Sequence, residues 1–415
     1  MATIHTLIIG GGQAGLAFSR CLTDAGIEHL VLERGRIAER WRSERWDSLR
    51  LLTPRWQARL PGWSYRGGDP DGYMPREEVV RYLEQYADSF PVPLRTGVTV
   101  TGVEPHPDGF RVISDDGTWT ARNVVIATGE CDRPWVPPFA AALPGDVEQV
   151  VPTRYRNPRQ LPDGGVLVVG ASATGIQLAE EIHASGRPVT LAVGQHTRLP
   201  RLYRGRDILW WLDRLGLFDQ RAWDVPNIET SRGQPSLQLV GTPDRRTLDL
   251  GVLNGRGVRI VGRVHDADGH HLSLGHDLLE HTVAADVKLA RLRMRIDAYI
   301  RDHGLEQEVG DEEPFVPVRL PDPPVSLDLR EAGIRAVVWA TGFRREFPWL
   351  RVPVLDARGE VRHTGGVTTW PGLYAIGFNF LRRRSSTFID GVGRDAVELA
   401  EHLVSRSPET RRGVA

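Results

Sequence analysis

Cysteine is almost absent from this chain of 415 residues, which contains only Cys21 and Cys131. Two cysteines so far apart in the sequence exclude a disulfide framework, and they also exclude a metal site built from clustered cysteines. Both are therefore interpreted as small buried apolar residues, and no metal site is predicted. A chain without disulfides fits a reducing compartment, so a cytoplasmic location is expected.

Long hydrophobic runs and an excess of one charge are also missing. The longest apolar runs, such as Leu7–Ile9 and Val166–Val169, are far shorter than the ~20 residues of a membrane-spanning helix. The N-terminus has no basic segment followed by an apolar stretch, so no signal peptide is predicted. The 52 basic and 53 acidic side chains leave a formal net charge of −1, which does not favour nucleic acid as a partner.

What the chain does contain is a repeated alternation of apolar strand, glycine turn and helix. The first copy is predicted as strand Thr6–Ile9, turn Gly10–Gly15, helix Gln13–Ala25 and strand His29–Leu32. The second copy is predicted as strand Val166–Val169, turn Gly170–Gly175, helix Ile176–Ser185 and strand Val189–Val193. Further patterns indicate a helix at Arg76–Ala87, strand-like alternation from Val98 to Val112, and a connection at Pro314–Pro324. The alternation predicts an α/β fold with doubly wound parallel sheets, and the length allows two or three domains.

The first glycine turn has the spacing of an adenine-dinucleotide site. Gly10, Gly12 and Gly15 form GxGxxG between a strand and a helix, where they permit a tight turn and close approach of a diphosphate. The helix start at Gln13 and Ala14 adds free amides and a favourable dipole. Glu33 follows the next strand, where a carboxylate can accept bonds from ribose hydroxyls. The alternative is a purely structural glycine-rich turn.

The second glycine turn differs at the positions that select the dinucleotide. Ser172 takes the middle glycine position, and no acidic residue follows the next strand. An acid there would repel a 2′-phosphate, whereas an arginine accommodates one, so NADP is favoured over NAD. Arg198 is the first candidate for this contact, and Arg201 and Arg204 are secondary candidates. The alternative is that these arginines are solvated surface residues.

Two such turns, each followed later by Ala-Thr-Gly, resemble the two-dinucleotide-binding-domain flavoproteins, and among them the class B flavin-dependent monooxygenases. Ala127-Thr128-Gly129 and Ala340-Thr341-Gly342 carry this resemblance, together with the stretch Trp46–Arg50. The resemblance implies two Rossmann-like domains, with FAD bound by residues 1–145 and 335–415 and NADPH bound by an inserted domain at 146–334. It assigns cofactor contacts to Gly10, Gly12, Gln13, Ala14, Gly15, Glu33, Arg34, Trp41, Arg42, Thr128, Gly129, Gly170, Ser172, Ala173, Thr174, Gly175, Arg198, Thr341, Gly342, Gly391 and Val392.

The resemblance also implies a reaction. NADPH would reduce FAD, and the reduced flavin would react with O₂ to give a C4a-(hydro)peroxyflavin that oxygenates a small organic substrate. Two departures from the family bear on this step: the segment Pro144–Tyr155 lacks the histidine of the family's linker motif, and Leu52 stands where many members have asparagine. The alternatives are an NADPH-dependent flavin oxidase or reductase without oxygen transfer, and a non-catalytic redox-sensing flavoprotein.

No catalytic side chain is assigned, but several residues are expected to lie near the flavin. These flavin-proximal candidates are Leu52, Thr53, Asn379 and Ser386. The apolar run Ile208–Leu212 is interpreted first as a packed helix face, and only then as a lid or a membrane patch. The helix predicted at Leu279–Ile300 is interpreted as a packing helix or as the interface of a homodimer.

Overall fold

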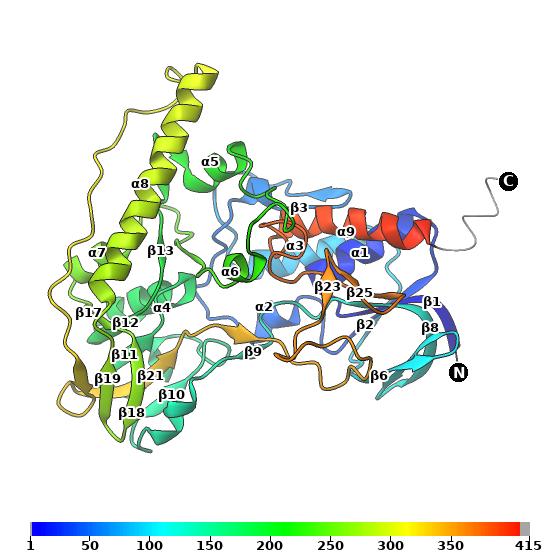
Figure 1. Ribbon diagram of the computed structural model, residues 1–415, viewed down its shortest axis with the longest axis horizontal. Helices are drawn as coiled ribbons and strands as arrows, with labels where there is room; N and C mark the ends of the chain where they lie inside the picture. Colours follow the sequence, from blue (N-terminus) through cyan, green and yellow to red (C-terminus); the bar gives the residue numbers. More distant parts are fainter. Residues whose placement is uncertain (1, 407–415) are drawn as a thin grey trace.

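The computed structural model describes residues 2–406, which form one mixed sheet with a parallel centre and one wholly parallel sheet, with helices packed around them (Figure 1). Strands from both ends of the chain build the first sheet, whose main order is β23-β24-β25-β8-β1-β2-β5. Their bounds are β1 (Ala2–Ile9), β2 (His29–Glu33), β5 (Leu94–Thr96), β8 (Gly117–Ile126), β23 (His363–Thr364), β24 (Val367–Thr368) and β25 (Leu373–Ala375). The strands β1, β2, β5, β8 and β25 pair in parallel.

The second sheet has the order β10-β21-β11-β12-β17, and all its pairings are parallel. Its strands are β10 (Glu148–Val150), β11 (Gly165–Val169), β12 (Val189–Val193), β17 (Arg259–Gly262) and β21 (Ile334–Trp339). The predicted domain boundary between residues 334 and 335 therefore falls inside β21, a strand that pairs with β11 in the second sheet. The α/β fold with doubly wound parallel sheets is confirmed.

The helices in the described part of the chain are α1 (Gln13–Asp24), α2 (Glu39–Ser43), α3 (Arg76–Asp88), α4 (Ala173–Ala184), α5 (Ile208–Arg214), α6 (Ile228–Arg232), α7 (Leu250–Gly255), α8 (Leu278–His303) and α9 (Ile389–Ser405). Most of them bury an apolar face, either against the sheets or in a separate core formed by α5 and α8, whereas the short helices α2 and α6 have no buried residues. Helix α1 packs beside α9, so the first and last helices of the chain share one core with the first sheet (Figure 1). The order of the chain therefore places both ends around one sheet and the middle around the other.

Short strands complete the connections between these elements. They are β3 (Arg59–Leu60), β4 (Trp63–Ser64), β9 (Arg133–Pro134), β13 (Thr197–Arg198), β14 (Leu202–Tyr203), β15 (Arg206–Asp207), β16 (Leu237–Gln238), β18 (Val264–Asp268), β19 (His271–Leu274), β20 (Ser326–Asp328) and β22 (Phe343–Arg344). Two longer strands, β6 (Val100–His106) and β7 (Gly109–Ser114), extend the first sheet antiparallel from β8. The alternation predicted from Val98 to Val112 is a hairpin, because β6 and β7 pair antiparallel and Gly109, with a φ of 127°, follows the turn. Periodicity of two cannot distinguish one long strand from a hairpin with a short turn.

The remaining element predictions differ from the structure mainly at their ends. Helix α4 begins at Ala173, three residues before the predicted start, because the end of the glycine turn is already helical. Helix α8 continues to His303 and ends at Gly304, whose φ of 65° is left-handed. Residues 314–324 carry neither helix nor strand, as predicted for a connection. In α5 the residues Ile208, Leu209, Trp211 and Leu212 are buried, which confirms the interpretation as a packed helix face.

Candidate cofactor-binding site

The first glycine turn lies between β1 and α1 at the carboxyl edge of the first sheet. A Cβ on Gly10 would lie 2.5 Å from the carbonyl oxygen of Ala127, and one on Gly15 would lie 1.9 Å from that of Gly10. These two glycines are therefore required by close backbone contacts within the protein. A Cβ on Gly12 would meet nothing within 4 Å. The middle glycine thus faces open space, as a turn that admits a diphosphate requires.

The start of α1 offers unpaired donors beside this open space. Gly12 is the N-cap, no side chain caps the helix, and its first turn contains no acidic residue. An anion at this position would accept from the free amides and gain from the helix dipole. The Glu33 carboxylate is held at the end of β2 by the amides of Gly11 and Gly35, at 2.6 and 2.8 Å. Diphosphate donors and a ribose acceptor are thus both present, so the residues fit an adenine dinucleotide.

The second glycine turn repeats this geometry between β11 and α4. A Cβ on Gly170 would lie 2.4 Å from the carbonyl oxygen of Ala340, and one on Gly175 would lie 1.7 Å from that of Gly170. Ser172 is the N-cap with the same backbone φ, −77°, as Gly12, and its hydroxyl makes no capping hydrogen bond. The second turn therefore repeats the backbone geometry of the first, with the difference that the Ala173 amide at the start of α4 donates to the Ser236 hydroxyl at 3.3 Å.

Strand register shows which residues of the two turns are equivalent. The amide of Gly10 donates to Leu32 O at 2.8 Å, and the amide of Gly170 donates to Ala192 O at 2.9 Å. The residue after each acceptor is Glu33 in the first fold and Val193 in the second. Val193 is fully buried and carries no charge, so the acid that would repel a 2′-phosphate is replaced by an apolar side chain.

The second Ala-Thr-Gly segment contacts the chain just after the first one, where the polypeptide crosses between the sheets. The Thr341 hydroxyl donates to Trp135 O, and the Trp135 amide donates to Gly342 O at 2.9 Å. Strands β9 and β22 then pair antiparallel. Gly129 and Gly342 both have positive φ, 81° and 96°, and Thr128 precedes the first of them. This crossing therefore joins the two halves of the fold through a pair of short antiparallel strands.

The C-terminal part of the chain closes over the start of α1. The Gln13 side-chain amide donates to Thr387 O at 2.9 Å, and Ala14 lies against Gly377. In the first turn of α9, a Cβ on Gly391 would lie 1.9 Å from Ser385 O, and the next residue, Val392, is fully buried. The beginning of the final helix is thus packed next to the first glycine turn.

Helix α2 contains two further cofactor-contact candidates, Trp41 and Arg42, whose surroundings differ. Trp41 packs against the cores of both sheets, so it lies between them. Arg42 donates to Ile37 O at 3.4 Å and pairs with Glu84 of α3. Arg34 is exposed, and its guanidinium lies 4.0 Å from Asp132. Trp41 therefore lies between the cores of the two sheets, whereas the guanidinium of Arg42 is engaged by the neighbouring helix.

The flavin-proximal candidates differ in how accessible their side chains are to a substrate. Leu52 packs against the core of α5, and Thr53 is half-buried. The Asn379 amide donates to Glu130 at 2.9 Å, and its side chain donates to Arg232 O at 3.0 Å. Ser386 does not face open space. It is fully buried, and its hydroxyl donates to Arg383 O at 2.7 Å while accepting from two backbone amides of its own turn.

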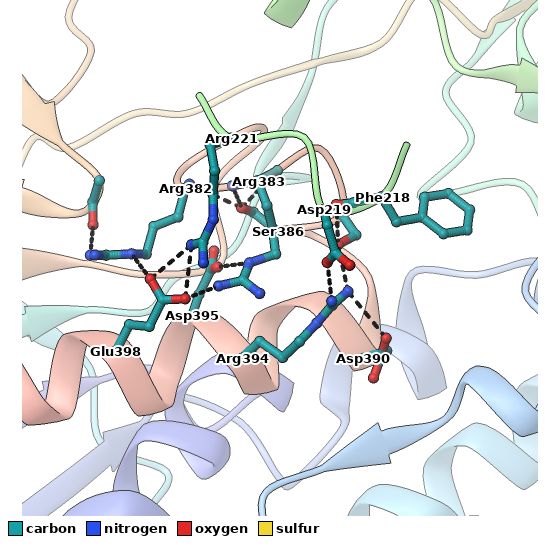
Figure 2. Close-up of polar contacts among 12 residues, drawn as sticks. Phe218, Asp219, Arg221, Arg382, Arg383, Ser386, Asp390, Arg394, Asp395 and Glu398 are labelled. Carbon is teal, nitrogen blue, oxygen red and sulfur yellow. Dashed lines mark hydrogen bonds and ion pairs between the residues drawn. The ribbon is translucent and has the colours of Figure 1, made fainter. Parts of the chain in front are cut away.

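A cluster of charged residues surrounds the turn that contains Ser386, and no pattern in the sequence predicted it (Figure 2). We name Arg221, Arg383, Asp395 and Glu398 the α9 clasp. Arg383 and Asp395 are buried and pair at 2.8 Å, and Glu398 binds Arg221 at 2.8 Å and also pairs with Arg383. Burial raises the pKa of Asp395 to about 6. The clasp ties the segment before α6 to the last helix, and local pattern cannot pair Arg221 with Glu398, because 177 positions separate them in sequence.

The arginines proposed for the 2′-phosphate all have acidic partners. Arg198 pairs with Asp249 at 2.8 Å and with Asp286, and it donates to Val316 O at 2.9 Å. Arg201 is fully buried and pairs with Asp207 at 2.5 Å. Arg204 lies 3.7 Å from Asp297. This geometry does not support the assignment of Arg198, because two carboxylates already neutralise its guanidinium.

The fold and the two turns define the chain as an oxidoreductase of the two-dinucleotide-binding-domain class. Residues 7–204 match the family model described as pyridine nucleotide-disulphide oxidoreductase. The chain is 33% identical to an uncharacterized oxidoreductase, CzcO-like, of Geobacillus kaustophilus, over 97% of this chain and 99% of that protein. It is 31% identical to the indole-3-pyruvate monooxygenase YUCCA6 of Arabidopsis thaliana, over 96% and 89% of the two chains.

A flavin-containing monooxygenase from Stenotrophomonas maltophilia has the same fold, with a TM-score of 0.67 at 20% identity over 98% of this chain and 99% of that one. The chain belongs to the class B flavin monooxygenase-like family, whose members are oxidoreductases that use FAD and NADPH. Its two cysteines are unpaired, and burial raises the pKa of both thiols. No helix in residues 2–406 is long and apolar enough to cross a membrane.

Proposed function

We propose that this protein is an FAD-dependent monooxygenase that consumes NADPH and transfers one oxygen atom of O₂ to a small organic substrate. The observation that carries the proposal is the pair of glycine turns with different residues at one equivalent position, Glu33 and Val193. A carboxylate suits a ribose with a free 2′-hydroxyl, and its absence permits a 2′-phosphate. Each turn is thus suited to a different dinucleotide, as electron transfer from NADPH to FAD requires.

In this proposal the chain binds, orients and shields the cofactors. When bound, FAD accepts hydride from NADPH and activates O₂, and this chemistry belongs to the cofactor. The amides at the start of α1 bind its diphosphate, and Glu33 binds its ribose. The start of α4 binds the diphosphate of NADPH. The crossing at Gly129 and Gly342 brings both sites together, and Trp41 excludes water between the two cores.

A second candidate function is an NADPH-dependent flavin oxidase that releases hydrogen peroxide. Leu52 favours it, because an apolar side chain provides no hydrogen-bond donor where many family members have asparagine. Leu52 is only half-buried, but it packs against the α5 core and so limits the access of water to this loop, which favours oxygen transfer instead. The relatives named as monooxygenases support the first function.

The two functions differ in the fate of O₂ after the enzyme is reduced. We expect NADPH-reduced enzyme, mixed with O₂ in a stopped-flow instrument, to regain oxidised-flavin absorbance only after a lag. With ¹⁸O₂ and indole-3-pyruvate as the first substrate tested, the product should gain one ¹⁸O atom; that substrate is chosen because a relative is named for it. Immediate return of the oxidised spectrum, with one peroxide released per NADPH consumed, would contradict oxygen transfer and identify an oxidase.

A further inference from the structure

The carboxyl edge of the second sheet contains an arginine that the sequence pattern did not indicate. Strands β12 and β17 are parallel, with Val193 opposite Gly262. The next residues along the two strands are Gly194 and Arg263, so they lie side by side at the edge where the second glycine turn also lies. The Arg263 side chain covers Gly194, with its Cδ 3.5 Å from the position of a Cβ on that glycine.

Arg263 differs from the neighbouring arginines in its partners. It is exposed, and among residues 2–406 no carboxylate lies within ion-pair distance of its guanidinium. Arg198 instead has two acidic partners, so that group of three side chains carries one net negative charge. A phosphate would be repelled by the group around Arg198 and attracted by Arg263.

A comparison of the strand ends beside the two glycine turns also points to Arg263. In the first fold Glu33 lies opposite Thr96, and Gly97 follows Thr96. The equivalent residues in the second fold are Val193, Gly262 and Arg263. A cation therefore replaces a glycine beside the position where the acid is lost. His196, the nearest titratable residue after β12, is buried, and desolvation lowers its pKa, so it stays neutral and does not compete for an anion.

We propose that Arg263 binds the 2′-phosphate of NADPH and sets the preference for NADPH over NADH. The inference rests on the proposed function only in that the second turn takes a nicotinamide dinucleotide. Gly194 is part of the site, because the aliphatic stem of Arg263 lies within van der Waals distance of this residue. Gln195, which is exposed, lies on the same edge and adds a neutral donor.

The test is a binding measurement that needs no turnover. Adenosine 2′,5′-bisphosphate and 5′-AMP are titrated into the FAD-loaded enzyme by calorimetry. We expect Arg263→Ala to weaken binding of the bisphosphate at least tenfold and to leave 5′-AMP binding unchanged. Arg259→Ala is the matched control, because Arg259 is exposed at the other end of β17 and has no ion-pair partner among residues 2–406. It should bind both ligands as the wild type does.

The outcomes separate this inference from the proposed function. Equal affinities of Arg263→Ala and wild type for the bisphosphate would overturn the role of Arg263 and leave the monooxygenase proposal intact. A loss of bisphosphate affinity in Arg198→Ala but not in Arg263→Ala would restore the assignment of Arg198. The same affinity of wild type for both ligands would show that no 2′-phosphate site exists, and would also overturn the inference.

A second, independent observation concerns the outer face of α8, which projects from the body of the molecule (Figure 1). Leu279, Val283, Val287 and Met294 are large apolar residues exposed on this helix, and Val287 and Met294 are 43% and 62% exposed. Together with the half-buried Ala290 they are spaced by three or four residues, so they form one stripe, the α8 stripe. Exposed apolar stripes of this kind mark helix interfaces.

The stripe is complementary to itself in an antiparallel arrangement. With a two-fold axis near Val287, Leu279 of one copy meets Met294 of the other, and Val283 meets Ala290. Glu280 lies beside the stripe on the same side as Arg291 and Arg295, and the two-fold axis places it opposite those arginines of the second copy. Apolar and charged residues both match, so we propose that a second copy of this chain covers α8 and forms a homodimer.

Sedimentation velocity over a concentration series tests the dimer. We expect the wild type to be dimeric and Val287→Glu to be monomeric, because the two-fold axis would bring two new carboxylates together. Val397→Glu, at an exposed valine of α9, is the control and should stay dimeric. Glu280→Arg should weaken the dimer, and adding Arg291→Glu and Arg295→Glu should restore it. A monomeric wild type, or a dimer unaffected by Val287→Glu, would overturn the proposal.

Discussion

The variant Gly12→Asp is expected to fold normally and to purify without flavin. A Cβ at residue 12 would meet no atom within 4 Å, and aspartate is a favourable N-cap for α1. Its carboxylate would lie where the turn is expected to bind the diphosphate, so like charges would repel. We expect FAD affinity to fall at least ~100-fold, about 2.7 kcal/mol, as measured by fluorescence titration of the apoprotein with FAD.

Ser172→Asp is the matched variant in the second fold. Ser172 has the same N-cap backbone as Gly12, so the new carboxylate keeps the cap and occupies the equivalent position. This variant should stay yellow, with one FAD per chain, and should bind NADPH at least ~100-fold more weakly. Full flavin content in Gly12→Asp would show that the first turn is not the flavin site. Loss of flavin in Ser172→Asp would show that the two turns are assigned in the wrong order.

The second large effect is expected at the α9 clasp. Asp395→Ala leaves the buried guanidinium of Arg383 without its closest buried carboxylate, although Glu398 still contacts it. Removing one partner of a buried ion pair costs about 3–5 kcal/mol, because the remaining charge has lost its compensation. The free energy of unfolding in urea should fall by this amount, and the segment from Phe218 to Arg221 should become sensitive to proteolysis (Figure 2).

The double variant Arg383→Met with Asp395→Leu separates charge from packing. It removes both charges and keeps apolar volume, so its stability should lie within about 1–2 kcal/mol of the wild type. Limited proteolysis of this double variant shows whether Glu398 and Arg221 alone hold the segment from Phe218 to Arg221. If they do, its cleavage should resemble that of the wild type. A loss below about 1 kcal/mol in Asp395→Ala would mean that Asp395 is not ionised in the folded protein.

The glycine turns were predictable because every residue that defines them is local. Gly10, Gly12 and Gly15 lie within six residues, and the strand before them and helix after them follow from short periodic patterns. Glu33 was predictable for the same reason, since one helix and one strand separate it from the turn. The structure places its carboxylate on the amide of Gly11 in the turn. Local pattern was therefore enough for the fold class and for the local geometry of the first glycine turn.

The arginine that we propose for the second site was not predictable in this way. Arg198 follows β12 closely in sequence, but Asp249 and Asp286 reach it from elements 51 and 88 residues away. Arg263 lies far beyond Gly194 in sequence, yet strand pairing makes them neighbours. Ser386 is a similar case, because its burial depends on the packing of α9 and not on its own turn.

By itself the sequence determined the number of dinucleotide turns, their place between strand and helix, and the difference in charge behind them, because short-range sterics and periodicity decide these features. Only the tertiary structure decided which cations stay available and which are neutralised, as at Arg263 and Arg198, and how the two chain ends share one core. The physical reason is that the availability of a charge depends on its neighbours in space. Those neighbours are brought together by strand register and helix packing over long separations in the chain.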